Sequence, residues 1–92
     1  MSEAPSPQQL VAACQVLVER GWGTSTSGNL SCRCGDDVYA TPTGVALGEV
    51  SADGLSRVDL QGRLLDGPRP TKELGLHLAV YRMQPNVRAV VH

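Results

Sequence analysis

Three consecutive residues, Thr71, Lys72 and Glu73, place a hydroxyl, a cation and a carboxylate at the predicted start of a helix. The first N–H groups of a helix lack partners within the helix and carry partial positive charge, so this segment suits a phosphate or a carboxylate. Glu73 does not fit that purpose. It either favours the helix dipole, or it holds a metal or a proton for chemistry on the bound anion.

Two further segments combine hydroxyl groups with glycine. A run of Thr and Ser over residues 24–27 is closed by Gly28 and Asn29, and Thr43 and Gly44 follow a predicted strand. Each segment alone is typical of an ordinary loop. Each is also a candidate anion nest, in which hydroxyls and backbone N–H groups surround a phosphate. The glycine spacing matches no nucleotide-binding loop, so we make no nucleotide assignment.

His92 follows a short apolar strand predicted over residues 89–91. A neutral imidazole and a carboxylate commonly bind a catalytic divalent metal together, so His92 and Glu73 are candidate ligands. A catalytic zinc usually takes three protein ligands, and one His with one Glu are too few. His77 lies one turn after Glu73, and we expect a hydrogen-bonded helix histidine there rather than a ligand.

The elements that must position these residues follow from periodicity and capping signals. Residues 1–5 are predicted to be a mobile end. Ser6, Pro7 and Gln9 match an N-cap, a first helical position and a capping box, and Gly21 supplies a stop. Alternation then predicts a hairpin of strands 30–34 and 38–40 around a turn at 35–37.

A second pair of strands is predicted over residues 55–60 and 63–65, around a turn at Gln61 and Gly62. Apolar residues at a helical period then predict a second helix, with Thr71 as its cap and Pro85 at its end. Asp53, Asp59 and Asp66 are expected to be surface and turn carboxylates.

Length and composition limit the core. Ninety-two residues make one small domain that buries roughly 60 to 65% of its unfolded surface. The chain has no Phe and a single Trp, Trp22, so its core is built from Val, Leu and Ala, or another piece of protein completes it. A net charge of −1 gives no basic surface for nucleic acid or anionic lipid. No apolar run approaches the ~18 residues that cross a bilayer. We therefore predict that the protein binds neither nucleic acid nor membranes.

The cysteines predict reduced thiols in a cytoplasmic protein. Cys14, Cys32 and Cys34 are an odd number, and no signal-peptide pattern precedes them. Two thiolates two residues apart do not complete a zinc site, so we expect structural burial.

Taken together, these segments resemble the class II aldolase and adducin family, which includes fuculose-1-phosphate aldolase and ribulose-5-phosphate 4-epimerase. The order and spacing of four matching pieces carry this resemblance. They are Gly28-Asn29-Leu30-Ser31 with Arg33, Thr41-Pro42-Thr43-Gly44, Pro70-Thr71-Lys72-Glu73 with His77 and Tyr81, and Pro85 with Ala89-Val90-Val91-His92.

The resemblance implies an α/β/α sandwich around a mainly antiparallel sheet, assembled as a homotetramer with active sites at subunit boundaries. It implies a metal-dependent lyase that acts on a small phosphorylated sugar or sugar acid through a metal-stabilised enediolate. Glu73 would be the catalytic acid/base, with a possible contact to the metal, and His92 the first of three histidine ligands to Zn²⁺. The implied phosphate-binding residues are Gly28, Asn29, Thr43, Gly44, Thr71 and Lys72.

Two positions refine the resemblance. Family members commonly have Ser where Lys72 stands, so this chain adds a positive charge to the anion site. Asp is typical of the epimerase branch at the position of Glu73, whereas aldolases and a branch of 3-oxo-tetronate 4-phosphate decarboxylases have Glu. The residues around Glu73 look most similar to that decarboxylase branch.

The resemblance also indicates that residues 1–92 are the N-terminal part of one longer family domain, here truncated after the strand that ends at His92. The second and third histidine ligands would lie beyond His92, so these residues alone are not expected to form a competent metal site. Two alternatives are a non-catalytic, adducin-like scaffold for oligomerisation and an inactive fragment. The combination of Glu73 and His92 with a phosphate-type site argues against a scaffold.

Overall fold

The structure is a computed structural model that describes residues 5–22 and 28–92. The elements, in chain order, are α1 (Pro7–Glu19), β1 (Leu30–Cys34), β2 (Asp37–Ala40), the 3₁₀ helices η1 (Leu47–Glu49) and η2 (Ala52–Gly54), β3 (Ser56–Asp59), β4 (Leu64–Asp66), α2 (Leu74–Met83) and β5 (Ala89–Val91). The predicted mobile residues 1–4 and the hydroxyl run 24–27 lie outside the described residues.

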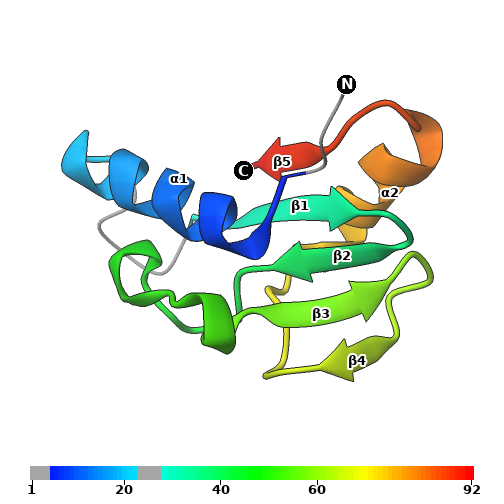
Figure 1. Cartoon of the computed structure of the whole chain (residues 1–92), viewed down its shortest axis with the longest axis horizontal. Helices are drawn as coiled ribbons and strands as arrows, with labels where there is room; N and C mark the ends of the chain where they lie inside the picture. Colours follow the sequence, from blue (N-terminus) through cyan, green and yellow to red (C-terminus); the bar gives the residue numbers. More distant parts are fainter. Residues whose placement is uncertain (1–4, 23–27) are drawn as a thin grey trace.

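The five strands form one antiparallel sheet in the order β4-β3-β2-β1-β5 (Figure 1). The last strand of the chain therefore lies beside the first, where Ser31 faces Ala40 of β2 on one side and Val90 of β5 on the other. Separate hydrophobic clusters pack around α1 and around α2, which cover opposite faces of the sheet. This arrangement confirms the predicted α/β/α sandwich around an antiparallel sheet.

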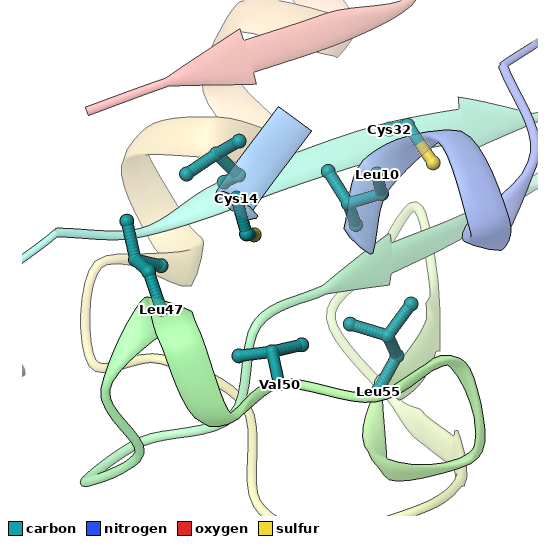
Figure 2. Packing of buried hydrophobic residues seen from close by; sticks show 7 residues of the cluster. Leu10, Cys14, Cys32, Leu47, Val50 and Leu55 are labelled. Atoms are coloured by element: carbon teal, nitrogen blue, oxygen red, sulfur yellow. The ribbon is translucent and has the colours of Figure 1, made fainter. Parts of the chain in front are cut away.

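Helix α1 begins as the capping signals predict. The N–H of Gln9 donates to the Ser6 hydroxyl at 3.2 Å, and the N–H of Ser6 donates to the Gln9 side chain at 2.8 Å, which completes a capping box. Leu10 and Cys14 of this helix are buried against β1 and the two 3₁₀ helices. Figure 2 shows this cluster, in which α1 covers residues of β1 and of the η1–η2 segment. It consists of Leu10, Cys14, Leu30, Cys32, Leu47, Val50 and Leu55.

The other face of the sheet packs against α2. Val38 and Val58, partners in the β2–β3 register, contact Leu78 and Tyr81 of the helix in a second buried cluster. These clusters contain Leu, Val, Cys and one Tyr, which agrees with a core of small aliphatic residues, the first of the two predicted alternatives. The second, that another piece of protein completes the core, stays a prediction. Several large apolar side chains nevertheless stay exposed, namely Val16, Trp22, Leu64, Leu65, Leu76, Met83 and Val91.

Three boundaries differ from the sequence-based prediction. Asp37 belongs to β2 rather than to the preceding turn, because it pairs with Cys34 and its carboxylate accepts a hydrogen bond from Arg57 at 2.9 Å. The predicted second hairpin is present, but β3 is one residue shorter at each end than predicted and β4 is shifted by one residue toward the C-terminus. Helix α2 begins at Leu74, since Lys72 and Glu73 form a turn in which the Glu73 N–H donates to the Thr71 hydroxyl at 3.2 Å.

All three cysteines are free thiols, with Cys14 and Cys32 buried and Cys34 half-buried, so the predicted burial is confirmed for the first two and is partial for Cys34. Burial raises the pKa of Cys32 to about 12, with the neighbouring Cys34 adding to the rise. Among residues 5–22 and 28–92, no helix has the length and apolar character to span a bilayer.

Candidate anion-binding site

In the described residues, parts of all three candidate anion-binding segments lie around one cavity of about 340 Å³, the first of them through Gly28 and Asn29. Its lining includes every residue predicted to bind phosphate and also Glu73. The lining residues are Gly28, Asn29, Pro42, Thr43, Gly44, Thr71, Lys72 and Glu73. A single concave, polar site therefore contains both the predicted anion-binding groups and the predicted acid/base.

Thr41 joins the three segments, and the sequence analysis gave it no role. Its N–H donates to the Leu30 carbonyl at 2.9 Å, and its hydroxyl accepts from the Leu30 N–H at 3.2 Å. On the other side, the Thr41 carbonyl accepts from the Thr71 N–H at 2.9 Å. Because Thr41 is buried and bonded in both directions, it fixes the distance between the start of β1 and the turn before α2.

The backbone donors at the cavity are of two kinds. The N–H groups of Asn29, Thr43 and Thr71 are used within the fold, where they donate to carbonyls of His92, Arg69 and Thr41. The N–H groups of Gly44 and Lys72, by contrast, donate to no acceptor in the described part of the chain. Gly44 has a φ of +75°, a left-handed conformation that suits glycine and that occurs in anion-binding nests.

The two charged residues of the site lie at its solvent side. Lys72 and Glu73 are both exposed, and Glu73 occupies the cap position of α2, where its side chain makes no capping hydrogen bond. The cation and the carboxylate are thus adjacent at the mouth of a cavity whose deeper wall is formed by the buried Asn29 and Thr71. This arrangement can bind an anion and leave a carboxylate beside it for proton transfer.

His77 is a buried, hydrogen-bonded helix histidine, as predicted. Its Nε2 lies 2.5 Å from Oδ1 of Asn29, and its Nδ1 lies 2.6 Å from the Ser31 hydroxyl. Burial lowers the pKa of His77, with the positive charge of His92 acting in the same direction and the carboxylate of Glu73 opposing both. The neutral imidazole therefore lies behind the cavity lining, where it forms a polar wall together with Asn29 and Ser31.

The Ser31 hydroxyl extends this wall to a second residue of α2, because it lies 2.7 Å from the Tyr81 hydroxyl. Sequence reasoning missed Ser31 as part of the site. The signal was available in principle, since Ser31 is a polar residue in the alternating strand β1, between Leu30 and Cys32 of the other face. Only the structure shows that it faces a histidine.

His92 does not line the cavity. Its backbone pairs with Asn29 through two hydrogen bonds of 2.9 Å, and its side chain is exposed. His92 is nevertheless close enough to the site to affect the titration of His77, as Glu73 does. In residues 5–22 and 28–92, no group of three or more His, Cys, Asp or Glu side chains is arranged to bind a metal ion. The donors present have the right chemistry for a divalent metal, but they do not complete a site.

Comparison with solved structures places this fold among those of fuculose aldolases. An L-fuculose 1-phosphate aldolase superimposes with a TM-score of 0.87 at 27% identity, over all of this chain and 45% of that one. The crystal structure of YgbL from Escherichia coli gives a TM-score of 0.89 at 37% identity, over 94% of this chain and 42% of its own.

The sequence comparisons agree. The model of the class II aldolase and adducin N-terminal domain matches residues 8–92, so the chain belongs to the class II aldolase and adducin family. A 3-oxo-tetronate 4-phosphate decarboxylase of Pectobacterium atrosepticum is 40% identical over 99% of this chain, and an L-fuculose phosphate aldolase of Methanocaldococcus jannaschii is 36% identical over 92%. The chain spans 42% and 46% of the length of these two relatives.

Proposed function

We propose that residues 1–92 are the N-terminal, phosphate-binding part of a lyase domain that breaks a carbon–carbon bond in a small phosphorylated sugar or sugar acid. The observation that carries this proposal is the cavity itself. Three segments that are far apart in the sequence converge on it with hydroxyls, backbone N–H groups, a lysine and a carboxylate. Relatives named as an aldolase and as a decarboxylase of phosphorylated substrates support the reaction class.

In this proposal the anion is held by Gly28, Asn29, Thr43, Gly44, Thr71 and Lys72. Side-chain hydroxyls and the carboxamide supply most of the contacts, because several of the backbone N–H groups are already bonded within the fold. Lys72 adds a charge that strengthens hydrogen bonds to a phosphate. Glu73, adjacent to Lys72, is then positioned to move a proton to or from the carbon skeleton of the same substrate.

We further propose that the complete protein binds a divalent metal, Zn²⁺ in the first instance, with His92 as one ligand. The support is the chemistry of the imidazole and of the nearby Glu73 carboxylate. The described residues supply too few donors for a catalytic site, so the remaining ligands would come from outside them. Metal analysis of the full chain before and after His92→Ala tests this assignment.

The same family assignment leads us to propose a cytoplasmic enzyme that works as a homotetramer. The exposed apolar side chains are consistent with surfaces that other polypeptide covers. We propose no nucleic-acid or membrane partner.

The test is the activity of the full chain on the two substrate classes that the relatives' names specify. Aldol cleavage of L-fuculose phosphate is followed by aldehyde formation, and decarboxylation of a 3-oxo-tetronate 4-phosphate by CO₂ release. We expect Glu73→Gln to lower kcat by roughly 10² to 10⁴, the usual contribution of an acid/base. KM should change little, because a neutral side chain of the same shape still lines the cavity.

Glu19→Gln is the matched control, since Glu19 is an exposed carboxylate at the end of α1 and does not line the cavity. It should leave kcat unchanged. Turnover that is the same in Glu73→Gln and the wild type would exclude the catalytic assignment. A full chain that binds neither substrate would instead favour the adducin-like scaffold.

A further inference from the structure

The polar groups behind the cavity form one continuous, buried chain of hydrogen bonds. It connects Asn29 of the cavity wall with His77, then Ser31, then Tyr81, over contacts of 2.5, 2.6 and 2.7 Å. Ser31, His77 and Tyr81 have no exposed surface, and Asn29 is 4% exposed. Such a network is costly to bury unless each member is satisfied, so its arrangement is tightly constrained.

The atoms involved fix the direction of every hydrogen in the chain. Oδ1 of Asn29 can only accept, so Nε2 of His77 carries the hydrogen. In a neutral imidazole Nδ1 then accepts, which makes the Ser31 hydroxyl the donor to it. The Ser31 oxygen is left to accept from Tyr81, and burial, which raises the pKa of this phenol to about 12, preserves the hydrogen it donates.

We propose that Ser31, His77 and Tyr81 are positioning residues that orient the Asn29 carboxamide, so that its oxygen faces His77 and its NH₂ end serves the anion site. This inference rests on the proposed function, because it requires a phosphate in the cavity. A carboxamide is nearly symmetrical in shape, and its two ends differ only in chemistry. An oxygen turned toward a phosphate would repel it, whereas an NH₂ group donates to it.

The backbone of Asn29 strengthens the argument. Its N–H and C=O are both bonded to His92 of the neighbouring strand segment, so this residue cannot turn as a whole. The orientation of the side chain is then set by the groups that bond to it, and the contact with Nε2 of His77 accounts for the position of its oxygen.

The experiment measures binding of inorganic phosphate to the full chain by isothermal titration calorimetry. Ser31→Ala removes the donor to His77, so the imidazole is free to change tautomer and the carboxamide to reverse. We expect the dissociation constant for phosphate to rise about five-fold to ten-fold, the equivalent of one hydrogen bond. Tyr81→Phe, which retains the ring, should have a smaller effect in the same direction.

Ser56→Ala is the matched control, because Ser56 is an equally buried serine on β3 whose hydroxyl donates to the Pro68 carbonyl at 2.7 Å, outside this network. It should leave phosphate affinity unchanged. Nitrogen-15 NMR of the unmodified protein provides a readout that needs no variant. The inference requires His77 to be protonated on Nε2, and a hydrogen on Nδ1 would overturn it.

The outcomes separate this inference from the proposed function. Wild-type binding with unchanged affinity in Ser31→Ala would overturn the positioning role and leave the anion site intact. No phosphate binding by the wild type would overturn both. Weaker binding in Ser31→Ala, unchanged binding in Ser56→Ala and an Nε2–H tautomer would together support the network.

Discussion

Lys72 is the only lysine in the chain, and it lies at the exposed side of the candidate anion site. An exposed cation contributes through a Coulomb interaction that dissolved salt screens. We predict that Lys72→Ser raises the dissociation constant for phosphate about three-fold to ten-fold at low ionic strength, a change of the order of 1 kcal/mol. Calorimetric titrations at low and high salt measure this effect.

Lys72→Arg is the control, since it retains the charge and should bind phosphate nearly as well as the wild type. The difference between Lys72→Ser and the wild type should shrink as salt is added. A difference that does not depend on salt would mean that Lys72 acts through the shape of the turn instead of its charge.

His77 makes the stability of the fold sensitive to acid. Its pKa is lowered in the folded state, first by burial, so the unfolded chain takes up the proton at a higher pH than the folded one. The contribution of His77 to the free energy of unfolding should therefore stay constant above about pH 6.5, the ordinary pKa of histidine. It should fall as the pH drops below that value. Urea unfolding between pH 8 and pH 5 measures this dependence.

The variant His77→Gln cannot titrate, and its unfolding free energy should fall less steeply over the same pH interval. It will also be less stable at pH 8, because it disturbs the bonds to Asn29 and Ser31. An equally steep fall in both proteins would assign the acid sensitivity to other groups.

At the scale of single residues, sequence patterns predicted the residues that line the cavity, but not the buried residues that hold the lining in place. The hydroxyl, glycine and charged residues that line it carry local signals of composition and of resemblance. Thr41 and Ser31 belong to segments that carry the resemblance, but their roles could not be predicted, because these depend on which residues face them across strands and from α2. A pairing partner many residues away is a property of the register, and local sequence does not specify it.

Among the elements, the connection from β4 to the Thr71 turn is the most tightly constrained. Gly67 has a φ of +87°, and a Cβ placed on it would lie 2.3 Å from the Leu55 carbonyl oxygen. We predict that Gly67→Ala lowers the free energy of unfolding by more than 2 kcal/mol, because about 1–2 kcal/mol of backbone strain is added to a clash with β3. Urea denaturation measures it.

The variant Gly35→Ala separates the cost of backbone strain from the cost of the clash. Gly35 also has a positive φ, of +65°, but nothing lies within 4 Å of an added Cβ. That variant should lose only the roughly 1–2 kcal/mol of backbone strain. Equal losses in the two variants would show that the chain relaxes around Leu55 without cost.

The helices and strands themselves were largely predictable because their signals are local. A capping box at Ser6 and alternation in β1 depend on neighbours a few residues away, and both were confirmed. The start of α2 was predicted too early, since Thr71 bonds to the Glu73 N–H as a cap would, yet a turn precedes the helix. The hydrogen bond from the Glu73 N–H to the Thr71 hydroxyl is compatible with a helix cap and with a turn, so it does not specify where the helix begins.

For the molecule as a whole, the exposed apolar side chains are the main unexplained feature. Trp22 is 66% exposed, Met83 75% and Val91 64%, in a chain that spans less than half the length of its relatives. We predict that residues 1–92 alone bind a hydrophobic dye such as ANS strongly, and that the longer protein proposed above, here called the full protein, binds it weakly. Fluorescence titration of the two proteins at equal concentration measures this.

A double variant, Met83→Lys with Val91→Thr, should lower dye binding by residues 1–92 if these side chains form the exposed surface. Strong dye binding by the full protein would contradict the expectation that other polypeptide covers them. Sequence composition had indicated a thin core, but it could not show which side chains would be left outside.

The cavity is closed by hydrogen bonds between residues that are remote in the chain, Asn29 with His92 and Thr41 with Thr71. Neither an early hairpin nor an isolated helix can reproduce it, so an anion that binds at the proposed site would have affinity for the folded state alone. Each ten-fold excess of ligand over its dissociation constant then adds about 1.4 kcal/mol to the stability of the entire domain. The cellular supply of substrate would thereby govern how long the protein survives proteolysis.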